Sequence, residues 1–391
     1  MVTSRVSLLH LHLLNEFFWS NQTMKTSHGK EFFSSSRLSL CGRLTLASLL
    51  SILVACAGLG IAKYRELQDL GTFGGRSALA WGVSADGSVV VGEIIHPDNS
   101  SHAFRWTQST GVDDLGTLGG KFVSVTGVSA NGTVVVGDII FGDNTSHVFR
   151  WTQSGGVQDL GSLGGVSASV SGVSADGSVL VGHTVLGDGT KHAFRWMQSN
   201  GVEDLGAFGS EWASATAVSA DGSVVVGNIL LGKNKVHVFR WTQSGGAHDL
   251  GALKGQSAWA YGVSADGSVV VGSVMYADAT VHAYRWTQSG GAQYLGLLGG
   301  KLAGARGVSA DGSVVVGNIL FGDKSVHPFR WTQSGGVQDL GTLGGVRASV
   351  TGVSADGMVV VGNIRFADGT YHAFVASFGK EASHPNAAQR M

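Results

Sequence analysis

The chain of 391 residues has little proline, little cysteine and few charged side chains. Its 3 prolines stand against 61 glycines, a balance that suits tight hairpins and excludes a proline-rich disordered or collagen-like chain. Charged residues make up 14% of the sequence, 26 basic against 27 acidic, so no basic surface and no nucleic-acid partner are expected. Both cysteines, Cys41 and Cys56, precede residue 64, which leaves the rest without a disulfide or a cysteine-based zinc site.

What the sequence does contain is a repeat of 45 residues. Histidines stand at this interval along the chain, and the residues around each of them recur as well. The repeated histidines are His102, His147, His192, His237, His282, His327 and His372. A fixed period of this length, without insertions, indicates one supersecondary unit that is copied seven times.

One copy of the repeat, residues 157–195, consists of short runs rich in strand-forming residues. Gly-Gly, Ala-Asp-Gly and Gly-Asp-Gly turns separate these runs, and none of them shows a sustained helical period. Four strands in about 45 residues are typical of one β-propeller blade. The sequence therefore predicts an all-β fold, a seven-bladed β-propeller of four-stranded, 45-residue repeats.

The two ends of the repeat array are complementary. The array opens with one strand-like segment at 67–71 and finishes with a third strand at 372–376 that no fourth strand follows. We expect the N-terminal strand to complete the last blade, because such closure removes exposed sheet edges. The predicted regions are a leader at 1–63, the propeller at 64–378 and a short polar tail at 379–391.

The leader has the composition of an export signal. Basic residues precede an apolar run from Leu44 to Ala62, and small residues follow its core. Leu53-Val54-Ala55-Cys56 resembles a bacterial lipobox, which would make Cys56 the lipidated N-terminus. Ordinary cleavage, or retention of the run as a membrane anchor, are the alternatives. In all three cases the repeats are exported. A further alternative is that the apolar run forms a core helix of the domain, but a closed array of repeats does not need such a helix.

The recurring motifs resemble a known bacterial family. His-Ala-Phe-Arg-Trp-Thr, Asp-Leu-Gly-Thr-Leu-Gly-Gly and Gly-Val-Ser-Ala-Asp-Gly return in order over roughly residues 66–378. Together they resemble the HAF-repeat family of extracellular proteins, some of which are autotransporter passengers. The resemblance implies an exported or surface protein and transfers no catalytic residue. Because only a short polar tail follows Phe378, without a translocator barrel, self-translocation is not expected.

Side chains that recur in every copy are assigned to structure. Each repeated histidine is expected to form a hydrogen bond within its own blade, since equivalent positions on a wide ring are too far apart to share one metal ion. The repeated arginines are expected to face aspartates of the neighbouring strand, as in Arg105 with Asp114 and Arg150 with Asp159. We find no nucleophile elbow, metal motif or phosphate loop, so the sequence predicts no catalytic residue, no metal, no cofactor and no enzyme.

Two segments of the repeat vary from copy to copy, one after the Gly-Gly pair and one before the repeated histidine. In an up-and-down blade both connections emerge on one rim, and the invariant turns emerge on the other. Diversified loops on a rigid scaffold are typical binding sites, with aromatic and arginine side chains as anchors; neutral drift is the alternative. The candidate ligand-binding residues are Arg76, Trp81, Lys121, Phe122, Glu211, Trp212, Trp259, Tyr261, Arg306 and Arg347.

The functional prediction is an exported, non-enzymatic binding module that uses this variable rim. Its expected partner is a protein or a glycan, with membrane contact only through the leader and a monomeric state. Its expected location is the bacterial cell surface, outer membrane or extracellular space, or else the periplasm. A glycan-acting hydrolase with a site at the propeller axis, and a purely structural envelope protein, are the alternatives. The hydrolase would require paired carboxylates near the axis with raised pKa values.

Overall fold

The structure, a computed structural model, describes residues 64–232, 235–297 and 299–379. The chain divides into two units, Met1–Gly60 and Ile61–Met391, and the described residues all belong to the second. The expected leader with Cys56, and residues 380–391 of the tail, lie outside the described residues. None of the described residues forms a helix, so they include no helix long and apolar enough to cross a membrane.

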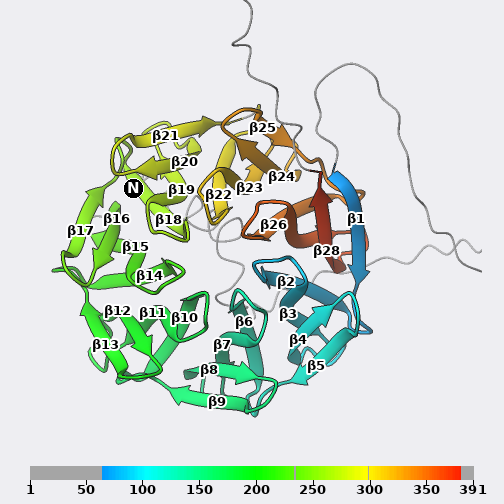
Figure 1. The fold of residues 1–391 in the computed structure, drawn as a ribbon, viewed down its shortest axis with the longest axis horizontal. Coiled ribbons are helices and arrows are strands. Elements are labelled where there is room, and N and C mark those ends of the chain that lie inside the picture. The colour runs from blue at the N-terminus through cyan, green and yellow to red at the C-terminus, as the bar shows by residue number, and fades with distance from the viewer. Residues whose placement is uncertain (1–63, 233–234, 298, 380–391) are drawn as a thin grey trace, which may run out of the picture. The chain divides into compact units, whose positions relative to one another are not determined.

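The described body is built of repeated four-stranded antiparallel sheets, as the sequence predicts. Figure 1 shows these sheets arranged radially, with one strand of each nearest the centre and one at the periphery. The inner strands are β2 (Ser77–Val83), β6 (Phe122–Val128), β10 (Ser167–Val173), β14 (Trp212–Val218), β18 (Ser257–Val263), β22 (Leu302–Val308) and β26 (Arg347–Val353). The second strands are β3 (Val89–Ile95), β7 (Val134–Ile140), β11 (Val179–Val185), β15 (Val224–Leu231), β19 (Val269–Met275), β23 (Val314–Leu320) and β27 (Val359–Arg365).

The two remaining strands of each sheet lie farther from the centre (Figure 1). The third strands are β4 (Ser101–Thr107), β8 (Ser146–Thr152), β12 (Lys191–Met197), β16 (Lys235–Thr242), β20 (Val281–Thr287), β24 (Val326–Thr332) and β28 (Tyr371–Phe378). The outer strands are β1 (Tyr64–Gly71), β5 (Gly111–Gly116), β9 (Gly156–Gly161), β13 (Gly201–Gly206), β17 (Gly246–Gly251), β21 (Gly291–Gly296) and β25 (Gly336–Asp339). The outer strand β1 pairs with β28, so one sheet joins the two ends of the described body in the order β1-β28-β27-β26.

Neighbouring sheets touch through backbone as well as side chains. Two pairs of sheets are linked by a single parallel bridge, Lys191 with Trp212 and Val281 with Leu302. The alanines of the Ala-Asp-Gly turns also bond from one sheet to the next, and Ala355 N–H donates to Ala85 O at 2.9 Å. Along the chain the donors before it are Ala85, Ala130, Ala175, Ala220, Ala265 and Ala310, each bonded to the alanine 45 residues later.

The core lies between the sheets and explains the invariant glycine in the second strand. Phe194 is fully buried and its ring lies over Gly182. A Cβ at Gly182 would stand 2.0 Å from Ser169 O and 3.0 Å from Cε1 of Phe194, so only glycine fits. Each apolar cluster draws on two consecutive sheets; Ala78, Phe104 and Trp106, for example, pack in one cluster with Val361 and Ala373. The sheets are therefore held to one another by the same aromatic side chains that recur in the sequence.

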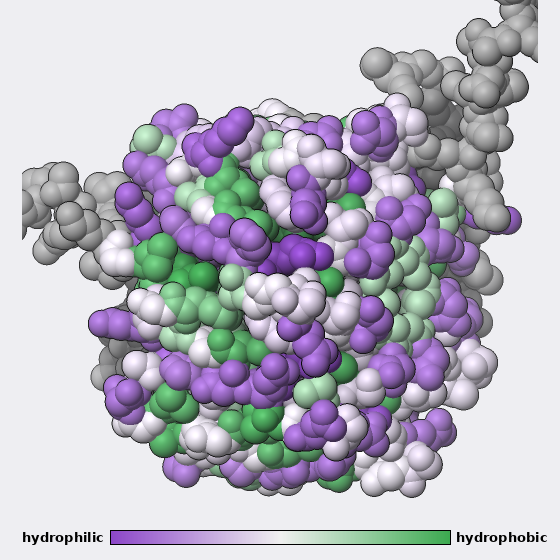
Figure 2. All heavy atoms as spheres, turned by 60° about the vertical axis from the view of Figure 1, so that its left-hand side comes forward, coloured by the Kyte–Doolittle hydropathy of each residue, from purple (hydrophilic) through white to green (hydrophobic). Residues whose placement is uncertain are grey.

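The surface outside these clusters is mixed in character. Figure 2 shows the left-hand side of Figure 1 turned forward, and on that face hydrophobic residues are scattered among hydrophilic ones. Such a distribution is ordinary for a surface in contact with water. The exposed large hydrophobic side chains include Val166 and Val346, both in connections between sheets.

Candidate functional site

The sheets have two chemically different edges. At one edge, which we call the variable rim, the connection before each inner strand meets the hairpin between the second and third strands. In the first repeat Arg76 N–H donates to Ile95 O at 2.7 Å, which fixes residues 72–76 beside residues 96–100. At the opposite edge, the repeat rim, lie the Ala-Asp-Gly turns and the hairpins that lead to the outer strands. Variation and repetition are thus segregated in space as well as in sequence.

The repeat rim uses its acidic residues to build turns. Asp86 accepts hydrogen bonds from the hydroxyl of Ser84 at 2.6 Å and from the backbone N–H of Ser88 at 3.0 Å. These bonds, above all the one from Ser84, lower the pKa of Asp86. A carboxylate that already accepts several local donors is occupied by the turn.

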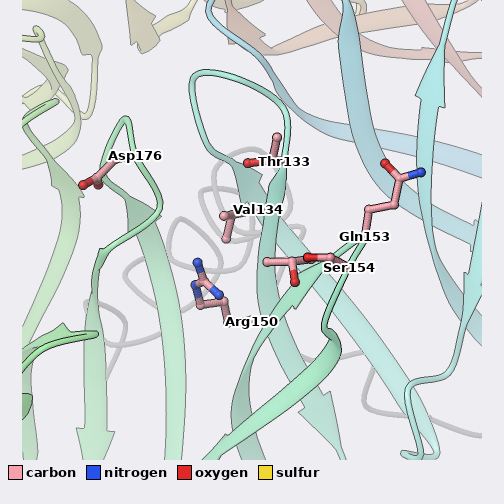
Figure 3. Close-up of a pocket in the computed structure, with 7 residues that line it drawn as sticks. Thr133, Val134, Arg150, Gln153, Ser154 and Asp176 are labelled. Atoms are coloured by element: carbon pink, nitrogen blue, oxygen red, sulfur yellow. The ribbon is translucent and has the colours of Figure 1, made fainter.

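A hollow of about 450 Å³ lies on the repeat rim. Figure 3 shows Arg150 between the turn that carries Thr133 and the turn that carries Asp176. Arg150 Nε donates to Gly177 O at 3.2 Å, which ties it to the next sheet. The other lining residues, Val134, Thr152, Gln153 and Ser154, also come from motifs that recur in the other sheets. This hollow is therefore a product of the repeat and is not distinctive of one copy.

Six of the predicted binding residues lie on the variable rim, where the inner strands begin. Arg76, Lys121 and Glu211 are exposed, and Phe122, Trp212 and Arg347 are partly buried. The Lys121 ammonium lies 5.2 Å from the centre of the Phe122 ring, a cation–π distance. Glu211, the one carboxylate that the sequence offers for an axial site, is an exposed rim residue. Its backbone carbonyl accepts the N–H of Lys191 at 3.1 Å.

The other four predicted residues do not belong to this rim. Trp81, Tyr261 and Arg306 stand at the bulge near the far end of their inner strands, five residues into each strand. At about 3.3 Å per residue the bulge is roughly 13 Å from the rim. Trp259 lies mid-strand opposite Ser273. The prediction that these ten residues form one site is wrong, because the start of an inner strand lies at the variable rim and its bulge lies far from that rim.

Two of these four residues contact each other. The Arg306 guanidinium lies 5.0 Å from the centre of the Tyr261 ring. Burial raises the pKa of Tyr261 to about 12 and lowers the pKa of Arg306. The pair joins adjacent inner strands, so its evident role is packing between sheets.

The predicted pairing of arginines with aspartates is also wrong. The hairpin pairs Thr107 with Gly111, which leaves residues 108–110 as its loop, and in this register Arg105 faces Asp113 and Asp114 faces Phe104. Asp114 accepts instead from His102, whose Nδ1 lies 3.0 Å from both carboxylate oxygens. The same pairing recurs between His147 and Asp159, His192 and Asp204, His237 and Asp249, His327 and Asp339, and His372 and Asp69. The repeated histidines thus hold an outer strand to a third strand within one sheet.

A set of buried polar side chains, which the sequence analysis does not single out, follows the invariant glycine of each second strand. Its members are Glu93, Asp138, His183, Asn228, Ser273, Asn318 and Asn363. Several of them reach the inner strand of the next sheet. Asn228 Oδ1 accepts the N–H of Ala260 at 2.8 Å, and Asn363 Oδ1 accepts that of Ala80 at the same distance. The signal in the sequence is a polar residue of changing type within an otherwise apolar strand.

Two members of this set are acidic. Burial raises the pKa of Glu93 and that of Asp138 to about 7 each. Glu93 accepts the N–H of Val125 at 2.8 Å, and Asp138 accepts the N–H of Val170 at 2.9 Å and the hydroxyl of Ser169 at 2.6 Å. Burial also lowers the pKa of His183 to about 3. Because both carboxyl groups are 8% exposed and bonded to the next sheet, we assign them to the junctions between sheets.

One group of side chains could hold a metal ion. His96, His102 and Asp114 each offer a ligand atom, and these atoms lie within 4.8 Å of one another. His96 belongs to the loop at 96–100 on the variable rim, within a segment whose sequence varies from repeat to repeat.

Comparisons with known proteins identify the fold and no family. No protein-family model matches the chain, and no curated protein matches its sequence. Among solved structures it resembles the β-propeller domain of the Trilobed protease from Pyrococcus furiosus, with 12% identity and a TM-score of 0.55. That match covers 79% of this chain and 100% of the other. It resembles acylaminoacyl peptidase from Pyrococcus horikoshii with 12% identity and a TM-score of 0.54. That match covers 78% of this chain and 52% of the peptidase. Puromycin hydrolase matches with 15% identity and a TM-score of 0.51, and the match covers 83% of this chain and 57% of the hydrolase.

These likenesses correct the expectation that the protein is not an enzyme. Solved structures that share its architecture include a peptidase, a hydrolase and a protease domain, so the fold gives no ground for excluding an enzyme. At this identity the likeness extends to the fold alone. The chain spans about half the length of the peptidase and the hydrolase that it resembles. The chain has the β-propeller fold.

Proposed function

We propose that the described body is a seven-bladed propeller that β1 closes by completing the last blade. The pairing of Gln68 with Val375, and of their neighbours in β1 and β28, supports this closure. The hydrogen bond from Ala355 back to Ala85, and that from Ala80 N–H to Asn363 at 2.8 Å, support it independently at the inner strands. The Trilobed protease domain, by contrast, is described as having an open velcro topology.

We further propose that the protein is an exported binding module whose variable rim recognises a protein or a glycan. The observation that carries this proposal is the segregation of the two edges. Nearly identical turns form one rim, while Arg76, Lys121, Glu211 and Trp212 diversify the other on the same backbone. A rigid scaffold with loops that differ only on one side is the usual design of a binding surface. The protein acts in this proposal as a monomer.

Export is supported by the leader and by the resemblance to HAF-repeat proteins, to which we propose the chain is related. Cys56 as the lipidated residue remains the first choice among the three fates of the leader. Mass spectrometry of the mature N-terminus separates them. A lipid adduct on Cys56 supports anchoring, a free residue just after it indicates ordinary cleavage, and an intact leader indicates a membrane anchor.

The binding proposal is tested with two triple variants of the full chain. Arg76→Ala, Lys121→Ala and Trp212→Ala remove three variable-rim side chains, and Thr110→Ala, Gln153→Ala and Ser154→Ala remove three exposed ones from the repeat rim. Binding is measured to purified envelope material and to a glycan array. We expect the first variant to bind at least tenfold more weakly and the second to bind as the wild type does. Equal loss in both, or in neither, would contradict a binding role of the variable rim.

A further inference from the structure

The first repeat carries a group of ligating side chains that the other described repeats lack. His96, His102 and Asp114 come from three successive elements, the loop after β3, strand β4 and strand β5. Their ligand atoms lie within 4.8 Å of one another, and no other group of three such residues occurs among residues 64–232, 235–297 and 299–379. They stand on the variable rim, with 44% of the Asp114 side chain and 27% of the His102 side chain exposed.

The backbone around His96 is the same as in its counterparts. The N–H of His96 donates to Ser100 O at 3.0 Å, and the N–H of Asn99 donates to His96 O at 2.9 Å. In the second repeat Phe141 makes the equivalent bonds, with Thr145 O and with Asn144 N–H, both at 3.0 Å. His96 therefore occupies a position that the fold fixes, and the difference between the repeats is confined to its side chain.

At that position the other repeats place an apolar or aromatic residue over the histidine. These residues are Phe141, Leu186, Leu231, Tyr276, Phe321 and Phe366. The aromatic ones lie with their ring centres 4.5–4.9 Å from the histidine ring. His96 packs over His102 in the same manner, at 4.2 Å and 58° between the planes. It keeps the shape of the stack and adds two ring nitrogens.

One of the added nitrogens lacks a partner. His96 Nε2 is buried and has no hydrogen-bond partner in the part of the chain that the structure describes. A buried polar atom without a partner is unfavourable, and such atoms usually have an explanation in function or in a bound ion. Phenylalanine, which stands at this position in three repeats while tyrosine stands there in a fourth, would avoid that cost. The histidine is thus a substitution that packing alone does not favour.

We propose that His96, His102 and Asp114 form a binding site for a zinc-like divalent transition-metal ion. Two imidazoles and one carboxylate are ligands that such ions prefer, and three protein ligands leave a fourth position for water or for a group of a partner. His102 Nδ1 and Asp114 are already 3.0 Å apart, close to the spacing of about 3.3 Å between neighbouring ligands around tetrahedral zinc. The ion takes the place of the hydrogen on His102 Nδ1, and the neutral imidazole then carries its hydrogen on Nε2.

Only a small movement is needed to bring the three ligand atoms to the spacing of ligands around one metal ion. His96 has to bring its ligand atom from within 4.8 Å to the ligand spacing, and rotation of the exposed Asp114 side chain shares that movement. The five His–Asp pairs without a third ligand serve as internal controls, because their geometry matches that of His102 and Asp114. The site binds its ion whether or not the variable rim recognises a partner.

The test is zinc titration of the full chain, purified without a histidine tag, followed by calorimetry. We expect one tight site per chain in the wild type. His96→Phe, which copies the stack of Phe141 over His147, should weaken binding about a hundredfold or more while leaving the melting temperature of the metal-free protein unchanged or higher. Cobalt provides a second readout, since a tetrahedral site gives a visible absorption band that the variant should lose. Equal zinc affinity in the wild type and in His96→Phe would overturn the proposal.

The converse variant keeps the test independent of any loss of folding. Phe141→His installs the third ligand beside His147 and Asp159, which are 2.9 Å apart as in the first repeat. We expect this variant to bind two zinc ions per chain. If it still binds one, a third histidine over a His–Asp pair does not create the site and the proposal is wrong. The histidines of residues 1–63 are present in all forms, so any binding there cancels in the comparison.

Discussion

At the residue scale, one position decides how neighbouring sheets are joined. The residue after the invariant glycine of the second strand reaches into the next sheet, and asparagine there satisfies both the N–H and the C=O of one residue. Asn318 Oδ1 accepts the N–H of Val350 at 2.8 Å and its Nδ2 donates to Val350 O at 3.1 Å. Asp138 occupies the equivalent position with a carboxyl group, which can act as a donor only when it is protonated. Burial raises the pKa of this carboxyl group to about 7.

Asp138→Asn should therefore stabilise the protein at alkaline pH. The pKa of Asp138 rises from 3.8 to about 7 on folding, so between these values the folded state holds more protons and its stability falls as the pH rises. The wild type loses about 4 kcal/mol at most from this group across that interval, whereas asparagine loses none. We expect a higher melting temperature for the variant at pH 8 and little difference at pH 4. A variant that is less stable than the wild type at pH 8 would contradict this assignment.

At the scale of elements, the register of the outer hairpin determines which repeated side chains meet. Pairing of Thr107 with Gly111 places Arg105 opposite Asp113, and Asp114 bonds to His102. Arg105 Nε then donates to Gly132 O in the next sheet at 3.1 Å. The histidines thus bond within a sheet and the arginines bond between sheets. Alternation of side chains along a strand cannot reveal this, because a change of one residue in the hairpin loop changes the cross-strand partner of every paired residue.

The junctions made by arginine should contribute to stability one by one. Arg195 is 7% exposed, and its Nε donates to Gly222 O at 3.0 Å while its Nη1 lies 3.2 Å from Glu203. Arg195→Met keeps the stem and removes the donors, so we expect a loss of about 1–3 kcal/mol in the free energy of unfolding. Arg76→Met, at an exposed position of the variable rim, is the control and should change the midpoint of urea unfolding little. An unchanged midpoint in Arg195→Met would mean that packing alone holds this junction.

At the scale of the whole molecule, one sheet joins the two ends of the described body. Asp69 near the start of the body accepts from His372 near its end, at 2.9 Å, in the same arrangement as the pairs within single repeats. Val361 and Ala373 pack with Ala78 and Phe104 in one apolar cluster. The two ends of the described body therefore contact each other through hydrogen bonds and through core side chains.

A disulfide between β1 and β28 tests that closure in solution. Gln68 and Val375 are directly paired, at a Cα separation of about 5 Å that suits a disulfide. In a background with Cys41→Ser and Cys56→Ser, Gln68→Cys with Val375→Cys should oxidise completely within one chain. The melting temperature should rise, since cross-linking such distant residues contributes up to about 5 kcal/mol. Gln68→Cys with Val202→Cys, on another outer strand, is the control and should keep two free thiols, as counted by mass spectrometry.

Much of the architecture was accessible from the repeat itself. Its period, its glycine turns and the unpaired strand at each end predict four-stranded sheets and the pairing of β1 with β28. The candidate site was accessible only in part. Arg76, Phe122 and Trp212 reach the variable rim because they stand at the start of their strands. Tyr261 and Arg306 do not reach it, because they lie at the bulges near the far ends of β18 and β22.

The sequence by itself determined which residues repeat and hence which can be structural in all copies, because identical units must pack against one another in the same way. Only the tertiary structure decided the partners of those residues, since strand register and contacts between sheets bring together positions such as His102 and Asp114, or Asn363 and Ala80, that no local spacing relates. It also places His96, where the other repeats have an aromatic residue or leucine, beside a His–Asp pair that most of the repeats share.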